Sequence, residues 1–187
     1  MNKSELLNRL SDIEWDDFEV KEARSELPKS IWETVSAFSN TSGGWIVLGV
    51  SKKGKRYDIL GVENAEKQEQ DFTTVLRSRS KFNVLINPKC MKYLIDGKTV
   101  LAFFIPSSGQ KPVYFGSLIN TFVRTGSGDQ RATESEIDAL FRDQSFGNTI
   151  MCLFKGLETM LTILLEWVIA DLRMKTIPNW MPCVKGL

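Results

Sequence analysis

The sequence contains no histidine among its 187 residues. Histidine is the side chain that most often transfers protons near pH 7, and it supplies the base in Ser-His-Asp and Cys-His catalytic sites. Its absence excludes those sites and every metal site with an imidazole ligand. Any chemistry in this chain must therefore come from carboxylates, amines, hydroxyls or thiols.

Cysteine is also scarce. The three cysteines, Cys90, Cys152 and Cys183, are odd in number, and no two of them have CxxC spacing. This pattern fits neither a zinc ribbon nor a closed disulfide framework. Because the N-terminus also lacks an apolar signal core, we expect a protein of the reducing cytoplasm.

The chain has no hydrophobic run typical of a membrane span. In the apolar C-terminal region, charged residues interrupt the pattern at Lys155, Glu158 and Glu166. The uncharged stretch at 159–165 is far shorter than the roughly 20 residues that a transmembrane helix needs. We therefore expect no membrane as a partner.

Charge is distributed unevenly, although the formal net charge is only +1. Residues 1–26 hold eight acidic and four basic side chains, whereas residues 72–131 hold nine basic and two acidic ones. A denser basic cluster, with four cations in five residues, occupies 52–56. The local field of this basic middle therefore indicates the kind of partner better than the total charge does.

The order of the predicted elements indicates an α+β fold. Periodicity and turn signals predict helices at 4–10, 28–39 and 65–78 and one capped by Thr133 and Glu136, with strands at 17–22, 45–50, 57–60, 91–95, 98–105 and 121–124. The strands at 45–50 and 57–60 are expected to form one hairpin with a cationic tip, and Asp96-Gly97 the turn of a second. We expect a mixed or antiparallel sheet with two β-hairpins packed on helices.

The C-terminal region differs in character, so we place a boundary between a domain at 1–146 and a helical tail at 147–187. Apolar residues recur there in steps of four and three along one face of a predicted amphipathic helix: Ile150, Phe154, Leu157, Leu161, Leu164 and Val168. Such a seam packs either on its own domain or on a second copy. A homodimer through the 150–172 helix is the second of these interpretations.

Several blocks of the sequence follow one another in an order known from one family. They are Phe18-Glu19-Val20-Lys21, residues 37–50 with Asn40-Thr41-Ser42-Gly43-Gly44, Lys111-Pro112-Val113-Tyr114, and Val123-Arg124-Thr125-Gly126-Ser127. Together with Ala132 and Glu136 they cover residues 12–143, and they closely resemble the Schlafen or AlbA-like domain of bacterial and archaeal transcriptional regulators. The residues that carry this family motif are Glu19, Lys21, Asn40, Thr41, Gly43, Gly44, Gly49, Arg124, Gly126 and Ser127.

The resemblance implies a domain that binds DNA or RNA, often fused to a divergent ATPase-like region and a winged helix. The function expected from it is that of a transcriptional regulator module that binds DNA. Clustered cations are the candidate contacts, because they neutralise phosphates and release counterions. These candidate nucleic-acid-binding residues are Lys52, Lys53, Lys55, Arg56, Arg77, Arg79, Lys89, Lys92, Lys98 and Arg124. A solvated basic loop is the alternative interpretation of the first cluster.

Two other functions stay open. Some Schlafen relatives cleave RNA with two glutamates and a later aspartate that hold a divalent metal, and the resemblance places Glu14 and Glu19 at the glutamate positions. Such carboxylates bind Mg²⁺ or Mn²⁺ without histidine. Where the aspartate would stand, this chain has Ser51-Lys52, so Asp58 on the opposing strand is the substitute candidate. Otherwise these glutamates are surface carboxylates and no cofactor is needed. The third function is a protein-interaction module with an acidic partner.

Overall fold

The computed structural model of the chain describes residues 1–11, 16–54, 56–126 and 128–175. The chain forms two compact units, residues 1–144 and 145–187. The domain boundary predicted after residue 146 stays a prediction, because compactness alone does not show that either unit folds independently.

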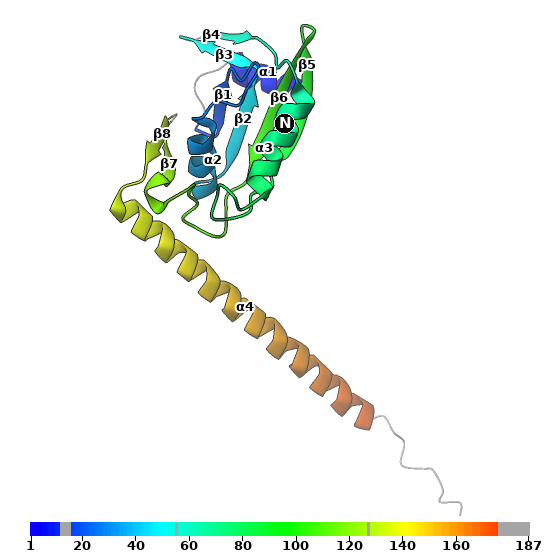
Figure 1. Cartoon of the computed structure of the whole chain (residues 1–187). Coiled ribbons are helices and arrows are strands. Elements are labelled where there is room, and N and C mark those ends of the chain that lie inside the picture. The colour runs from blue at the N-terminus through cyan, green and yellow to red at the C-terminus, as the bar shows by residue number, and fades with distance from the viewer. Residues whose placement is uncertain (12–15, 55, 127, 176–187) are drawn as a thin grey trace, which may run out of the picture. The chain divides into compact units, whose positions relative to one another are not determined.

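The first unit is built on a four-stranded sheet with the strand order β1–β2–β6–β5 (Figure 1). These strands are β1 (Phe18–Lys21), β2 (Gly44–Leu48), β6 (Lys98–Ile105) and β5 (Lys89–Ile95). β1 lies parallel to β2, whereas β6 is antiparallel to both β2 and β5. This mixed sheet, with helices packed on it, confirms the predicted α+β class.

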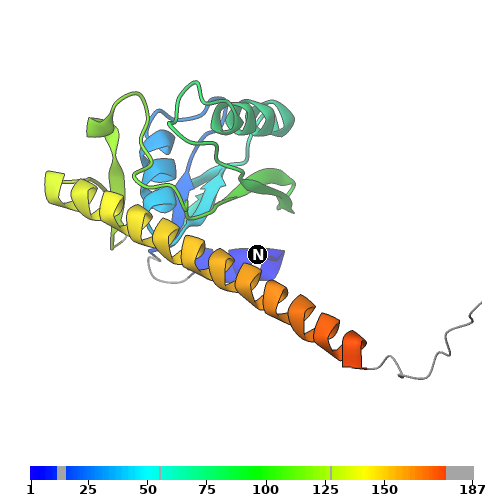
Figure 2. The same cartoon turned by 90° about the horizontal axis from the view of Figure 1, so that it is seen from below.

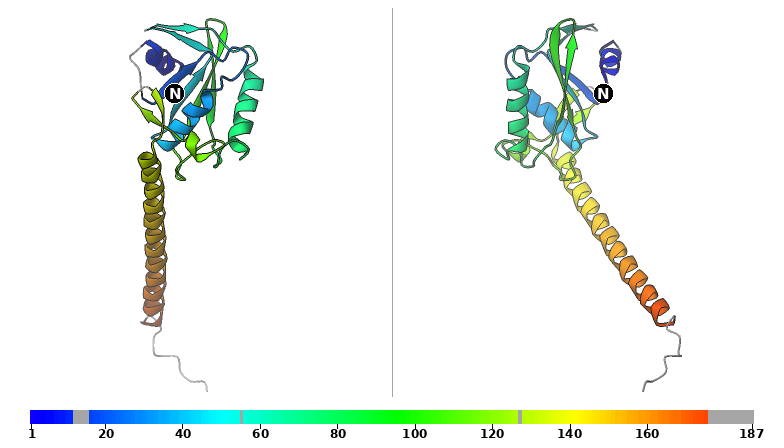
Figure 3. Two further views of the ribbon diagram at one scale, coloured as in Figure 1. Left: turned by 60° about the vertical axis from the view of Figure 1, so that its left-hand side comes forward. Right: turned by 90° about the vertical axis from the view of Figure 1, so that its right-hand side faces the viewer.

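Helices cover both faces of the sheet. α2 (Ile31–Asn40) and α3 (Ala65–Arg77) pack on one face and α1 (Lys3–Ser11) on the other, as the edge-on view in Figure 3 shows. Figure 2 shows α1 and α3 on opposite sides of the same strands. A separate hairpin of β3 (Val50–Lys53) and β4 (Arg56–Ile59) shares the α1 side. This double cover explains why β2 is an uninterrupted apolar run.

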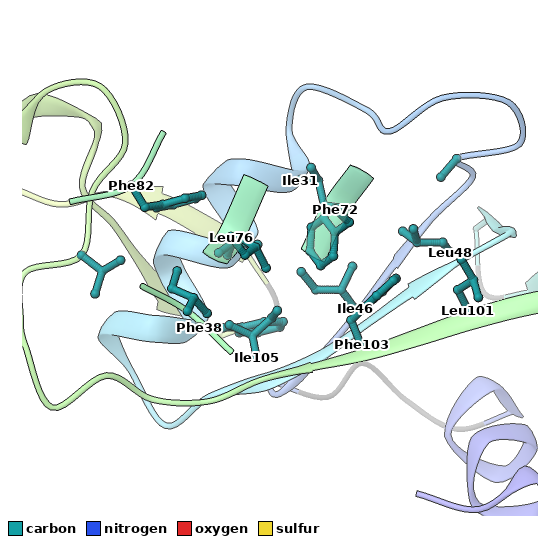
Figure 4. Close-up of a cluster of buried hydrophobic side chains, with 14 of the residues drawn as sticks. Ile31, Phe38, Ile46, Leu48, Phe72, Leu76, Phe82, Leu101, Phe103 and Ile105 are labelled. Carbon is teal, nitrogen blue, oxygen red and sulfur yellow. The ribbon is translucent and has the colours of Figure 1, made fainter. Parts of the chain in front are cut away.

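Alternation along β2 and β6 divides the core into two layers. The layer beneath α2 and α3, drawn in Figure 4, includes Ile46, Leu48, Phe72, Leu101 and Phe103. The layer beneath α1 includes Leu6, Val47, Val50, Val100 and Ala102. Because each layer buries large aliphatic or aromatic side chains, both contribute to the hydrophobic stability of the sheet.

Both predicted hairpins are present, one with the predicted strands and the other with a first strand that is shifted along the chain. Asp96 and Gly97 have φ values of 49° and 74°, which is the left-handed pair of a type I′ turn between β5 and β6. The run at 45–50, however, does not pair with 57–60 as one strand. It divides at Gly49, whose φ is 89°, so that β2 joins the central sheet and Val50 begins β3. Val50 and the residues at 57–59 therefore belong to both the predicted and the observed hairpin, whereas the rest of the 45–50 run does not.

A third hairpin, of β7 (Phe122–Thr125) and β8 (Gly128–Arg131), follows a 3-10 turn, η1 (Leu118–Asn120). The sequence predicts a strand at 121–124 followed by the helix capped by Thr133, so β8 is missed. The reason is that Asp129-Gln130-Arg131 shows no apolar alternation.

Helix α4 (Glu134–Lys175) begins at the predicted capping box. The Thr133 hydroxyl accepts a hydrogen bond from the Glu136 backbone N–H at 3.3 Å, and the Glu136 carboxylate accepts one from the Thr133 N–H at 2.7 Å. Neither α4 nor any other helix in the described part of the chain combines the length and apolar content needed to cross a bilayer.

Candidate nucleic-acid interface

The densest basic cluster lies at the tip of the β3–β4 hairpin. The register places Lys53 opposite Arg56, with Gly54 in the turn at a φ of 63°. Lys52 and Arg56 are exposed, and no atom lies within 4 Å of the position that a Cβ on Gly54 would take. Lys55 lies outside the described residues. The tip therefore stands clear of the core and carries basic residues on both strands.

The turn between β5 and β6 lies at the same end of the sheet as the β3–β4 hairpin (Figure 1), and Lys98 is the first residue of β6. It follows the β5–β6 turn, and its ammonium group donates a hydrogen bond to the backbone oxygen of Ile59 at 2.7 Å. Ile59 is the last residue of β4. This bond connects the two hairpins at the end of β4 away from the tip, so Lys98 lies at the base of the basic hairpin and not at its tip.

A second group of predicted cations lies at the opposite end of the sheet. Arg77 and Arg79 are exposed at the end of α3, and Lys89 is exposed where β5 begins. From Lys89 to Ile95, next to the turn, β5 spans about 20 Å. The structure therefore divides the predicted exposed cations between two ends rather than uniting them in one patch.

Lys92, midway along β5, is paired with an acidic residue. Its Nζ lies 2.6 Å from Oε2 of Glu69 on α3. The hydrogen bond to Glu69 raises the pKa of Lys92. Because Glu69 already offsets its charge, we leave Lys92 out of the candidate interface.

Arg124 is almost buried, with 4% of its side chain exposed. Its guanidinium group forms ion pairs with Asp129 at 2.8 Å and with Glu19 at 3.1 Å. It also donates hydrogen bonds to the backbone oxygens of Asp16 at 3.0 Å and Phe18 at 3.2 Å. These contacts join the β7–β8 hairpin to β1, and the predicted phosphate contact of Arg124 stays a prediction.

Glu19 and Lys21 extend this network along the edge strand β1. Lys21 Nζ lies 3.0 Å from Oε1 of Glu19, while Arg124 binds the other carboxylate oxygen. Asp129 Oδ2 accepts a hydrogen bond from the Thr34 hydroxyl at 2.6 Å, which ties the network to α2. The structure thus brings Arg124 together with Glu19, a motif residue 105 positions earlier, and with the neighbouring Lys21.

Asn40 is 3% exposed at the end of α2. Its Oδ1 accepts a hydrogen bond from the Val113 N–H at 2.7 Å, and its Nδ2 donates to the backbone oxygens of Val113 at 2.8 Å and Phe122 at 2.9 Å. One turn earlier, the Ser36 hydroxyl donates to Val113 at 2.7 Å and accepts from the Phe122 N–H at 3.0 Å. The motif asparagine therefore holds β7 and the segment at 111–114 against α2.

The motif glycines Gly43 and Gly44 lie in the turn from α2 into β2, where there is no space for a side chain. Gly43 has a φ of 85°, and a Cβ there would lie 2.7 Å from the backbone oxygen of Ile105. A Cβ on Gly44 would lie 2.7 Å from the Phe38 ring. Thr41 donates its hydroxyl hydrogen to a carbonyl oxygen of the preceding turn at 2.8 Å. Gly49 and Gly126 also have positive φ values, and Ser127 lies outside the described residues.

The carboxylates of the metal-dependent alternative do not form a metal-binding set in this arrangement. Both oxygens of Glu19 are held by cations, Asp58 is exposed on β4, and Glu14 lies outside the described residues. Within residues 1–11, 16–54, 56–126 and 128–175, no three carboxylate or thiol groups gather closely enough to hold a metal ion. The described residues alone do not fit Mg²⁺ or Mn²⁺, and we derive no cleavage step from them.

Sequence reasoning misses the partners that hold the motif in place. The pairing of Asp129 with Arg124 had a basis in the sequence, because opposite charges are favoured at positions that face each other across two strands. The β7–β8 register places these two residues opposite each other. No comparable signal existed for Thr34 and Ser36. Hydroxyl side chains on a helix look the same in a sequence whether they face solvent or a buried backbone.

Comparison with known proteins agrees with this geometry. The model of the Schlafen AlbA_2 family matches residues 14–133. No curated protein sequence matches the chain. Among solved structures, the chain resembles the N-terminal domain of a Nitrosomonas europaea protein whose description relates it, provisionally, to the ATP-dependent DNA helicase RecG. The identity is 27%, the match covers 71% of this chain and 95% of that one, and the TM-score is 0.53.

A Corynebacterium diphtheriae protein is 20% identical, with 68% of this chain and 27% of that chain covered and a TM-score of 0.47. The family match spans more than half of the chain, and it contains Asn40 together with the ion pairs of Glu19 and Arg124. The chain therefore belongs to the Schlafen AlbA_2 family.

Proposed function

We propose that this chain is a nucleic-acid-binding module that contacts phosphates through the cationic end of its sheet, and that double-stranded DNA is its ligand. The observation that carries the proposal is the register of the β3–β4 hairpin, which places Lys53 opposite Arg56 at an exposed tip. Like charges directly across a strand pair destabilise a hairpin. A polyanion bound at the tip neutralises this repulsion, so binding and hairpin stability support each other.

Contacts of this kind depend on charge more than on sequence. Cations at a hairpin tip neutralise phosphates and release counterions, which makes binding tight at low salt and much weaker at high salt. The exposed group of Arg77, Arg79 and Lys89 offers a second contact at the other end of the sheet, along which β5 alone spans about 20 Å, or about six base pairs. We therefore expect weak sequence preference, because phosphate contacts position a protein without reading bases.

The choice of DNA rests on the comparisons. The description of the Nitrosomonas europaea protein refers to a DNA helicase, and its N-terminal domain is the part that resembles this chain. Family membership supports nucleic-acid binding more generally. That this binding serves a transcriptional regulator is part of the proposal and rests on the family resemblance alone.

The test is a titration of the full chain against a labelled duplex by fluorescence anisotropy. Replacing two exposed hairpin cations, Lys52→Glu with Arg56→Glu, should weaken binding by at least about tenfold. The slope of log affinity against log salt should become shallower by about 2, since each lost phosphate contact removes about 1. The matched control is Lys29→Glu with Arg142→Glu, which makes the same charge change at two exposed positions away from the tip.

The proposal holds only if the hairpin variant binds the duplex more weakly than the control variant does. If both weaken binding equally, only net charge matters and the hairpin is not the contact. If the parent chain binds neither duplex, single-stranded DNA nor structured RNA, a protein-interaction module is the better explanation. Running the same mixtures on a gel with Mn²⁺ or chelator tests the nuclease alternative, which predicts cleavage that Glu19→Ala abolishes.

A further inference from the structure

The most exposed hydrophobic surface of the described residues lies on α4 within the second unit. Eight large apolar side chains between residues 153 and 165 are each 51–64% exposed: Leu153, Phe154, Leu157, Met160, Leu161, Ile163, Leu164 and Leu165. Every residue from 153 to 166 is exposed. Contiguous apolar surface of this kind marks an interaction site on a soluble protein.

The apolar residues are concentrated on one side of the helix. At about 100° per residue, seven of the eight fall within an arc of about 140° that runs from Met160 to Leu165. Ile163 is the exception and lies on the far side. The charged residues of this segment, Lys155, Glu158 and Glu166, all lie outside the arc. The segment at 153–166 is therefore an amphipathic helix whose apolar face is uncovered.

We propose that this face packs against the same face of further copies of the chain, which form a homo-oligomeric helical bundle. The width of the arc decides the architecture. A two-stranded coiled coil uses a narrow seam and places charged residues beside it. Here the seam of Phe154, Leu157, Leu161 and Leu164 is flanked by apolar Leu153, Met160 and Leu165. Each helix can therefore contact two neighbours, so we expect three or four copies rather than two.

The area available is sufficient for a stable interface. Fully burying one large aliphatic or aromatic side chain removes about 60–120 Å² from water. Seven such side chains on each of two copies correspond to roughly 800–1,700 Å², which reaches the range of about 1,200–2,000 Å² found for specific protein interfaces. In a bundle of three or four copies, each helix divides these seven side chains between its two neighbours.

Charge favours a protein partner over a membrane surface. Helices that lie on anionic bilayers carry lysine and arginine on their polar face. The polar face at 153–166 carries one lysine and two glutamates, a net charge of −1. An anionic bilayer would repel this face, whereas a copy of the same helix meets its apolar side with an equally apolar one.

The test is the mass of the full chain in solution without nucleic acid, measured by analytical ultracentrifugation from about 1 to about 100 µM because self-association depends on concentration. The 21.2 kDa chain should sediment with about three or four times its own mass. Leu157→Glu with Leu164→Glu should weaken association at least about a hundredfold, because charges in the apolar seam must then be desolvated.

The matched control is Thr159→Glu with Ile163→Glu, which introduces two charges into the same helix segment outside the arc and should leave the mass unchanged. As a control of folding, circular dichroism should show that both variants keep the helix. A parent chain that stays at 21.2 kDa throughout, or an assembly that the control variant dissolves equally, overturns the proposal. Monomeric protein that binds anionic phospholipid vesicles would also overturn it, in favour of a membrane surface. None of these results depends on nucleic-acid binding.

Discussion

A buried amide such as that of Asn40 can satisfy backbone groups that no sheet or helix reaches. Its side chain is the partner of the Val113 N–H and of the Phe122 backbone oxygen. Replacing it by alanine leaves both groups buried without that partner, at about 1–3 kcal/mol each. We therefore predict that Asn40→Ala lowers the free energy of unfolding by about 2–4 kcal/mol, measured by urea denaturation.

Asn64→Ala is the control for the asparagine substitution itself. The Asn64 side chain caps α3 by accepting a hydrogen bond from the Lys67 N–H, and it is exposed. Its loss should cost about 1 kcal/mol, which is typical for an N-cap. Equal costs at the two positions would contradict the structural role given to the motif asparagine.

The Cys90 thiol should be unreactive in the folded protein. Burial, followed by the nearby charge of Glu69, raises the pKa of Cys90 from 9.0 to about 12. Because only the thiolate reacts, the reactive fraction at pH 8 falls from about one in ten to about one in ten thousand. We predict that iodoacetamide modifies Cys90 about a thousandfold more slowly in the folded chain than in urea. The rates are measured by mass spectrometry on a variant in which Cys152 and Cys183 are replaced by serine.

The pH dependence of the alkylation rate tests the direction in which the pKa of Cys90 is shifted. Because the pKa of Cys90 is raised in the folded protein, its thiol keeps the proton at a pH at which the unfolded chain has already lost it. The thiolate therefore forms at higher pH in the folded state. The rate in urea should level off above about pH 9, whereas the native rate should still be rising near pH 11. A native rate that levels off together with the unfolded one would show that burial does not protect the thiol.

At the scale of elements, Gly43 decides how closely α2 and β6 approach. An added Cβ meets the Ile105 backbone oxygen at 2.7 Å, and the left-handed φ adds strain of about 1–2 kcal/mol for any other residue. Gly54 has a similar φ but open space around it. We predict that Gly43→Ala costs at least about 3 kcal/mol in urea denaturation and Gly54→Ala about 1 kcal/mol. Similar losses would mean that strain alone, and not close approach, requires glycine at position 43.

Both edges of the central sheet are blocked by cations. At β1, the Arg124 guanidinium group binds the backbone oxygens of Asp16 and Phe18. At β5, the Lys3 ammonium group binds the backbone oxygen of Leu94 at 2.7 Å, and Lys92 lies on the same strand. Lysine and arginine at an edge discourage strand addition. Part of the basic character read from the sequence therefore also protects the edges of the sheet.

The elements differ in how far the sequence predicts them, and the reason is physical. The Asp96-Gly97 turn and the Thr133–Glu136 capping box follow from contacts only a few residues long, so both could be predicted. The division of the 45–50 run at Gly49 depends on tertiary packing against Gly61, which no local pattern shows. The pairing of Arg124 with Glu19 joins positions 105 residues apart, and the sequence contained only the two charges.

The same limit applies to the candidate interface. The basic cluster at 52–56 was visible as a run of charges, and the structure places its described members at the tip of one hairpin, with Lys98 at the base of that hairpin. That Arg77, Arg79 and Lys89 lie at the other end of the sheet depends on how α3 and β5 pack. Charge counts therefore predicted which residues are basic and not which of them share a surface.

At the scale of the whole molecule, the two proposals make a joint prediction. If α4 assembles several copies, each copy brings its own cationic hairpin, and a long duplex can engage more than one of them. Binding the second module is then intramolecular and raises the apparent affinity by about 10²–10⁴ without any new contact. Leu157→Glu with Leu164→Glu should remove this gain on a duplex of about 60 base pairs, measured by anisotropy.

A duplex of about 10 base pairs separates avidity from other causes. It is too short for two modules, since the length of β5 alone, about 20 Å, already corresponds to about six base pairs. On this short duplex the parent chain and the seam variant should bind equally, and their salt slopes should agree. On the long duplex the parent slope should be steeper, because more phosphates are neutralised per assembly. If the seam variant loses the same factor on both duplexes, α4 contributes to a single module's binding directly, and the link between assembly and affinity is wrong.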